Sequence, residues 1–173
     1  MPATDARHAK SAVGLGGCRR GYRQAVSTNA RVMSASPAQV WAVLADGWLY
    51  PLWVVGASRM REVDDTWPQP GARLHHSVGT WPLLLDDITE VVECRPGSLL
   101  ELKAHAWPAG RADVRIQLRP QGSDTEVIIE ESATKGPAAL LPNVLEDPLL
   151  KWRNVESLRR LAFLAERRHQ PVA

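Results

Sequence analysis

The chain has 173 residues and a nearly balanced charge, with 21 basic side chains against 19 acidic ones. Proteins that bind nucleic acid usually carry a strong basic excess on one face, so this balance argues against that class. Apolar residues make up 45% of the chain, yet no run approaches the roughly eighteen residues that span a bilayer. We therefore expect a globular protein of one domain, without integral membrane association.

The first residues give no sign of a folded element. Residues 1–22 mix Gly, Ala, Arg and Ser without periodicity, which predicts a flexible extension before a domain at 23–169 and a tail at 170–173. The stretch SAVGLGG is too short and too rich in glycine for the core of a signal peptide, so we expect a cytoplasmic location. Cys18 lies in this extension and Cys94 ends a predicted strand, so no framework disulfide is expected.

The domain opens with a predicted strand at 24–35, and a helix follows it directly. Ser36 is a good N-cap, Pro37 fits the first helical position, and Gln39 stands where a capping box requires Glu or Gln. Apolar residues then recur at helical spacing until an Asp-Gly pair ends the helix. A second short helical turn is predicted over 48–53, because a proline within it argues against anything longer.

The hydrophobic period then changes from that of a helix to that of a strand. Six strands are predicted, at Ser58–Val63, Arg73–Val78, Leu83–Cys94, Leu99–Ala106, Ala112–Arg119 and Thr125–Ala133. The turn clusters WPQPG, GTWP, RPG, WPAG and PQGSD separate them. Such short connections predict sequential antiparallel pairing, a meander.

The chain ends with a long amphipathic helix. We predict that Asp147 caps it, that Pro148 opens it and that it runs over Leu149–Arg168, after a loop or short turn in GPAALLPNVLE. The sheet needs a cover for its apolar face, and this helix is the predicted element long enough to supply it. The fold class is therefore α+β, with a curved antiparallel sheet of about seven strands around a C-terminal helix and two short helices after the first strand.

This element order resembles the START-like helix-grip superfamily, also called SRPBCC or polyketide cyclase/dehydrase-like proteins. The resemblance covers about 24–168, and its carriers are SPAQVWAVLAD with YPLW behind it, PGARLHHSVGTWPLLLDD, RPGSLLEL, DTEVIIEES and DPLLKWRNVESLRRLAFLAE. It implies a deep, mostly apolar cavity between sheet and helix, able to hold a lipid, a polyketide or another small hydrophobic molecule. It implies no reaction, because this fold hosts many functions.

Glu131 is the first candidate for a role in that cavity. Strict alternation in a strand aims its carboxylate to the same side as Val127 and Ile129, toward the interior. Buried carboxylates are rare unless they are paired. The functional hypothesis is a group that anchors a ligand or acts as a base, and the alternative is a solvated residue at the cavity mouth.

His76 is the second candidate, because it shares a strand face with Leu74 and Val78. We predict that it points inward and that it pairs with Glu131 across the cavity, where the two could move a proton near neutral pH. The alternative is a structural histidine whose hydrogen bonds are satisfied within the protein.

Two further polar residues are weaker candidates. Asp86 shares a strand face with Leu84 and Ile88, and it lines the cavity if that face is inward; a bulge would reverse the assignment. Asn154 lies on the apolar stripe of the terminal helix and either binds a ligand or joins an internal polar network. The apolar members of the predicted site are Leu102, Val114, Ile116, Ile129, Leu150 and Leu158.

Other side chains near these candidates have simpler expected roles. Arg153 and Arg159 are predicted to be solvated. Trp53, Trp81 and Trp107 lie beside turns, where they either gate a cavity entrance or pack against the turns.

Motifs for other chemistries are absent from the sequence. It has no P-loop, G-x-G-x-x-G, H-E-x-x-H, G-x-S-x-G or paired C-x-x-C, so no metal or cofactor is expected. Three hypotheses remain: a protein that binds a small hydrophobic ligand, a polyketide cyclase or dehydratase that uses His76 and Glu131, and an interaction protein with a collapsed cavity. The sequence leaves ligand, turnover and oligomeric state open.

Overall fold

The computed structural model describes residues 26–80, 82–106, 110–135 and 143–167. The predicted extension at 1–22, with Cys18, and the predicted tail at 170–173 lie outside these residues. Trp81 and Trp107 also lie outside them.

The first strand and the helix after it form as the sequence predicts. β1 (Val26–Met33) leads into α1 (Pro37–Leu44), which is followed by a short 3₁₀ turn, η1 (Gly47–Leu49), and by α2 (Tyr50–Trp53). Both bonds of the capping box are present: the Ser36 N–H donates to Gln39 Oε1 over 2.7 Å, and the Gln39 N–H donates to Ser36 Oγ over 3.4 Å. Two orphan N–H groups at the start of α1 are thereby satisfied.

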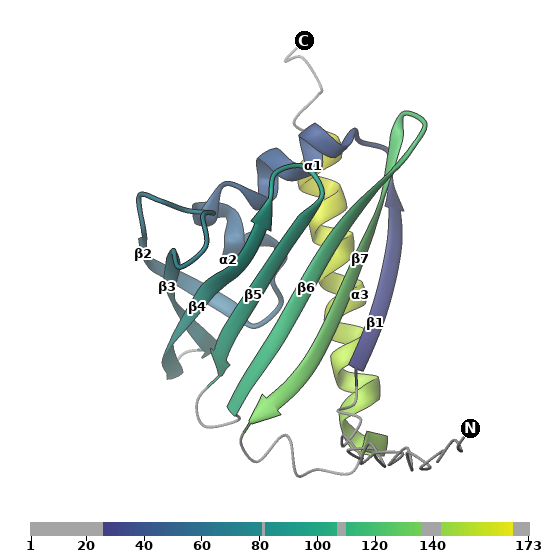
Figure 1. Ribbon diagram of the computed structural model, residues 1–173. Coiled ribbons are helices and arrows are strands. Elements are labelled where there is room, and N and C mark those ends of the chain that lie inside the picture. The colour runs from purple at the N-terminus through teal and green to yellow at the C-terminus, as the bar shows by residue number, and fades with distance from the viewer. Residues whose placement is uncertain (1–25, 81, 107–109, 136–142, 168–173) are drawn as a thin grey trace, which may run out of the picture.

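The strands among the described residues form one seven-stranded antiparallel sheet (Figure 1). After β1 they are β2 (Ala57–Val63), β3 (Arg73–Thr80), β4 (Leu83–Arg95), β5 (Leu99–Ala106), β6 (Gly110–Gln121) and β7 (Asp124–Lys135). Their order in the sheet is β1-β7-β6-β5-β4-β3-β2, so the last six form the predicted meander and β1 pairs with the last of them. The predicted fold class is confirmed.

The terminal helix begins earlier than predicted. α3 spans Asn143–Arg167, and Pro148 lies inside it rather than at its first position. A proline in a helix removes one backbone hydrogen bond, here the bond to the carbonyl of Val144. The first four N–H groups of any helix have no partner within it, so a proline just beyond them interrupts little of the helix.

The helices all lie on one side of the sheet, and α3 runs across that face (Figure 1). α3 packs against β1, α1 and α2, so the two short helices and the long one together cover the inner face. In antiparallel pairs, residues directly opposite each other point to the same side. The pairs Leu102–Val114 and Ile116–Ile129 therefore share the inner face.

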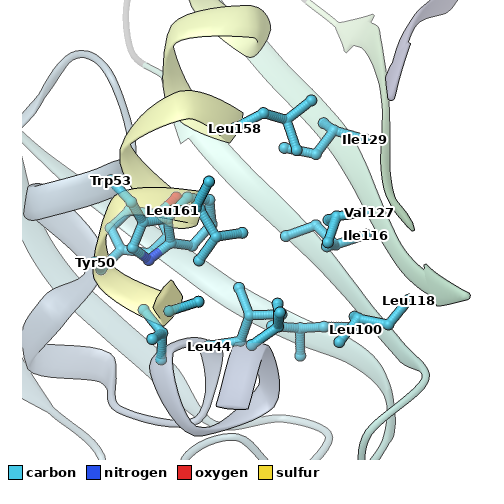
Figure 2. Packing of buried hydrophobic residues seen from close by; sticks show 14 of the residues in the cluster. Leu44, Tyr50, Trp53, Leu100, Ile116, Leu118, Val127, Ile129, Leu158 and Leu161 are labelled. Carbon is cyan, nitrogen blue, oxygen red and sulfur yellow. The ribbon is translucent and has the colours of Figure 1, made fainter. Parts of the chain in front are cut away.

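One end of the interior is filled with apolar side chains, and we call it the apolar end. It lies where β4 turns into β5 and β6 turns into β7, beneath α1 and the C-terminal half of α3. Figure 2 shows Leu158 and Leu161 of α3 facing Ile116, Val127 and Ile129 of the sheet. Its members are Met33, Val40, Val43, Leu44, Leu74, Leu100, Ile116, Leu118, Val127, Leu158, Leu161, Ala162 and Ala165, all at most 4% exposed. Burial of each large side chain contributes roughly 1.5–3 kcal/mol.

Candidate ligand pocket

A pocket of about 190 Å³ lies toward the opposite end of the interior, between the sheet, α2 and α3. Its lining is Tyr50, Trp53, Val54, Val55, Gly56, Ala57, His76, Val78, Asp87, Thr89, Leu102, Ala104, Ala112, Val114, Ile129, Glu131, Arg153, Asn154 and Ser157. Pockets for drug-sized ligands usually hold about 300–1,000 Å³, whereas a cavity of about 150 Å³ holds one benzene. The pocket is thus smaller and more polar than the sequence led us to expect, because side chains fill the apolar end.

The outer face of the sheet carries two shallow depressions of about 320 and 370 Å³. Their walls include charged side chains that pair with one another, as Arg115 does with Glu101 at 3.1 Å. Solvent screens charges at such a surface, and the one buried carboxylate that borders the second depression, Asp87, also lines the internal pocket. The internal pocket is therefore the candidate site.

A hydrogen-bonded chain of three side chains forms one wall of the pocket. Thr89 Oγ1 lies 3.0 Å from His76 Nε2 and 3.3 Å from Tyr50 Oη. The β3–β4 register places Leu74 opposite Thr89 and His76 opposite Asp87, so His76 and Thr89 meet diagonally on the inner face. Tyr50 reaches them from α2, with its ring centroid 5.2 Å from that of His76.

Burial shifts the titration of this wall. It lowers the pKa of His76 from 6.5 to about 4, and it raises the pKa of Tyr50 from 10.0 to about 12. It also raises the pKa of Asp87 from 3.8 to about 6, although the Ile88 N–H donates to this carboxylate over 2.8 Å. His76 Nε2 and Asp87 Oδ2 are 3.9 Å apart, beyond hydrogen-bond distance. Desolvation is the largest cause of each of these pKa shifts, so His76 is neutral at neutral pH.

Glu131 and Arg153 form an ion pair on the other side of the pocket. The Arg153 guanidinium donates to Glu131 Oε1. The Glu131 side chain is 4% exposed and that of Arg153 is 38% exposed, so the pair leads from the interior to solvent. Arg153 is therefore partly solvated, as predicted, but it also lines the pocket. The prediction that His76 pairs with Glu131 is wrong, because Glu131 pairs with Arg153 and His76 bonds to Thr89. A buried carboxylate requires a counter-ion, and the arginine one helical turn before Ser157 supplies it.

Two buried nitrogen atoms in the pocket lining have no hydrogen-bond partner among the described residues: His76 Nδ1 and Asn154 Nδ2. His76 is 2% exposed and Asn154 is 4% exposed. Next to Asn154 on α3, Ser157 Oγ accepts a hydrogen bond from the Val55 N–H over 3.1 Å. Buried polar groups are nearly always paired, so two orphans in one pocket are a reason to look for a ligand there.

The structure brings most of the sequence-predicted site residues together. His76, Leu102, Val114, Ile129, Glu131 and Asn154 line the pocket. Ile116 and Leu158 belong to the apolar end instead. Leu150 belongs to α3, but its side chain lies outside the described part of the protein. Trp53 is buried in the pocket wall.

Asp86 does not line the pocket, which corrects the prediction. Its side chain is 68% exposed and pairs with Arg61 at 3.4 Å on the outer side. The register pairs it with the outward side of β3 and sets Asp87 opposite His76. Both faces of this strand carry apolar residues, so alternation alone does not show which face is inward. The strand pairing does show it, because Asp87 lies opposite the inward-facing His76.

Sequence reasoning missed five polar lining residues: Tyr50, Asp87, Thr89, Arg153 and Ser157. Strand pairing with β3 would have identified Asp87 and Thr89. Helical spacing would have identified Arg153 and Ser157, because they lie four residues apart and in line with Leu161. We find no sequence signal for Tyr50.

The described residues contain no helix that is long and apolar enough to cross a membrane. Nor do they contain a group of three or more His, Cys, Asp or Glu side chains that could hold a metal ion.

No protein-family model matches the chain, and no curated protein matches it. Among solved structures, protein NE0264 from Nitrosomonas europaea is similar over 83% of this chain and 95% of its own, with a TM-score of 0.66 and 17% identity. StfQ, a di-domain ARO/CYC protein from the steffimycin biosynthetic pathway, is similar over 83% of this chain and 51% of its own, with a TM-score of 0.65 and 14% identity. Ara h 8.0201 is similar over 82% of this chain and 99% of its own, with a TM-score of 0.60 and 13% identity. The chain therefore has the helix-grip fold that its sequence predicts.

Proposed function

We propose that the protein binds a small molecule, about the size of one substituted ring, in the pocket between the sheet, α2 and α3. The observation that carries this proposal is the pair of buried, unpaired nitrogen atoms on His76 and Asn154, in the lining of a pocket of about 190 Å³. An unsatisfied buried polar atom costs about 1–3 kcal/mol, and a bound ligand would recover part of that cost.

The rest of the lining suits a mainly apolar ligand body. Trp53, Leu102, Val114 and Ile129 present apolar surface on the sides of the pocket. A ring between them would gain both burial and contact. A lipid or an extended polyketide chain would exceed the volume of this pocket. The proposed ligand is therefore smaller than the lipids and polyketides that the family resemblance implies.

A pocket-filling variant tests the proposal. In Ala104→Leu, added side-chain atoms occupy the pocket, while Lys103→Leu places the same side chain on the outer face of the same strand as a control. We expect ethylbenzene to bind to the wild-type protein and to Lys103→Leu, as measured by ligand-observed NMR, and to bind at least about tenfold more weakly to Ala104→Leu. A C14 fatty acid should not bind inside. If neither ethylbenzene nor acetophenone binds, or if binding is unchanged in a folded Ala104→Leu, the proposal is refuted.

A second candidate function is catalysis, and the wall of Tyr50, Thr89, His76 and Asp87 favours it. Catalytic acids and bases work best when their pKa lies near the operating pH. The pKa of Asp87, near 6, meets this condition better than that of His76, near 4. The likeness to an ARO/CYC protein is compatible with a cyclase or dehydratase in which Asp87, rather than Glu131, acts beside His76.

Deuterium exchange tests this second function. An enzyme that removes a proton next to a carbonyl should exchange the methyl protons of acetophenone in D₂O faster than buffer does. Asp87→Asn should remove that acceleration. Exchange at the buffer rate with bound acetophenone would rule out this chemistry and leave binding alone.

A further inference from the structure

The hydrogen-bond chain at His76 determines which ring nitrogen carries the proton. Thr89 has one hydroxyl proton, and its oxygen lies between Tyr50 Oη and His76 Nε2. In the first arrangement Tyr50 donates to Thr89, Thr89 donates to His76 Nε2, and the histidine proton resides on Nδ1. In the second, His76 Nε2–H donates to Thr89 and Thr89 donates to Tyr50.

The two arrangements leave different groups unpaired among the described residues. The first leaves one group unpaired, the His76 Nδ1–H donor. The second leaves two, the Tyr50 hydroxyl proton and the lone pair of His76 Nδ1. Each unpaired buried group costs free energy, so the first is favoured. Asp87 Oδ2 is 3.9 Å from Nε2, too far to accept a proton and reverse this order.

Asn154 supplies a second donor from another wall. Its Nδ2 group carries two N–H bonds and is without an acceptor among the described residues. Asn154 reaches the pocket from α3, whereas His76 reaches it from β3. The pocket therefore presents N–H donors from two elements, and both need an acceptor.

The charges around the pocket exclude a negatively charged acceptor. Arg153 is the cation in the described lining, and Glu131 already neutralises it. Asp87 adds negative charge above pH 6, while His76 is neutral. A ligand carboxylate would lose its hydration in a site without free positive charge. No ion pair would offset that loss, so its binding is unfavourable.

We propose that the ligand is a neutral ring compound with a carbonyl oxygen, which accepts hydrogen bonds from His76 Nδ1–H and Asn154 Nδ2–H. This proposal rests on the proposed binding function and narrows it to a ligand class. The apolar sides hold the ring, and the two donors select the oxygen. A hydrocarbon of the same shape would leave both donors unpaired.

Three probes of similar size separate the possibilities: acetophenone, ethylbenzene and benzoate. We expect acetophenone to bind to the full-length protein at least about tenfold more tightly than either of the others, in calorimetric or NMR titrations at pH 7. If ethylbenzene binds as tightly as acetophenone, the donor assignment is overturned and the binding function stands. Tightest binding of benzoate overturns the charge argument and the ligand class with it. If none binds, both proposals fall.

Two variants locate the preference. Asn154→Leu and His76→Phe each remove one donor at similar volume, and each should reduce the acetophenone preference about three- to tenfold while ethylbenzene still binds. Val155→Leu, on the exposed side of α3, is the control and should keep the full preference. In ¹⁵N NMR of the unliganded protein, the His76 ring should carry its proton on Nδ1. A proton on Nε2, or an unchanged preference in both donor variants, would overturn the inference.

Discussion

The two ends of the interior differ in what they bury. At the apolar end, side chains of α1, α3 and the sheet pack without buried charge. At the pocket end, the same sheet and helix bury His76, Asp87 and Glu131 around unfilled volume. The packing at the apolar end stabilises the fold. The buried polar groups at the pocket end destabilise it, and such a loss of stability is expected at a functional site.

The contrast is clearest along α3, which passes through both ends. Its earlier turns present Arg153, Asn154 and Ser157 to the pocket. Two turns later Leu161 and Ala165 lie fully buried in the apolar end. A single helix thus closes the pocket with polar atoms and anchors itself with apolar ones.

The largest expected effect comes from the apolar end. Leu161→Ala removes a fully buried side chain and should lower the free energy of unfolding by about 2–5 kcal/mol in urea denaturation. Phe163→Ala, at a position 53% exposed on the same helix, should change it by less than about 1 kcal/mol. Similar losses in the two variants would contradict the proposed division of the interior.

The pocket end should reveal itself in the pH dependence of stability. Unfolded Asp87 ionises at its ordinary pKa of 3.8, but the folded protein keeps the proton to about pH 6, so its contribution falls as pH rises between these values. Unfolded His76 is protonated below 6.5, but folded His76 stays neutral to about pH 4, so its contribution falls as pH drops through that window. Between about pH 4 and 6 the two contributions oppose each other.

Single variants should uncover the two opposing slopes. In Asp87→Asn, the remaining His76 should make stability increase with pH between 4 and 6, by up to about 1.4 kcal/mol per pH unit. In His76→Gln, the remaining Asp87 should make it decrease with pH by a comparable amount. Denaturation midpoints at several pH values measure both slopes, and slopes of the same sign would refute the assigned pKa directions.

The ion pair of the pocket end should have a smaller effect. Arg153→Met leaves the Glu131 carboxylate buried without its partner and should cost about 1–3 kcal/mol, less than for a fully buried pair because Arg153 is 38% exposed. The double variant Arg153→Met, Glu131→Gln should recover most of the loss, since no unpaired charge is left. Additive losses in thermal denaturation would mean that the pair does not act as a unit.

The smallest effect concerns a local feature of the apolar end, the cap of α1. Ser36→Ala removes the Oγ acceptor of the capping box and should cost about 1 kcal/mol. Ser36→Asp keeps an acceptor and should cost little. If both variants lose equal stability, the cap bond contributes nothing measurable.

The fold was predictable because local signals agreed with one another. The Ser36–Gln39 capping box, the change of hydrophobic period after α2 and the turn clusters each indicated the element that the structure contains. The start of α3 was not predictable from Pro148, because a helix accepts proline at its first position and also tolerates it just beyond its first turn. Local sequence does not distinguish these cases.

The site was predictable only where one element sufficed. His76, Glu131 and Asn154 were identified from alternation or helical spacing, and all three line the pocket. Identifying Asp87 required the register between β3 and β4. Identifying Arg153 required knowing that it pairs with Glu131 on another element. Pocket volume depends on how side chains from every element pack together, and periodicity does not report that.

Amide chemical shifts of the isotope-labelled protein, titrated with acetophenone, test the division of the interior most directly. We predict shifts at Gly56, at Val114 and at the Asn154 side-chain amide, with Val40 and Val43 of the apolar end unchanged. Shifts centred on the apolar end, or none at the pocket under saturating ligand, would contradict the account.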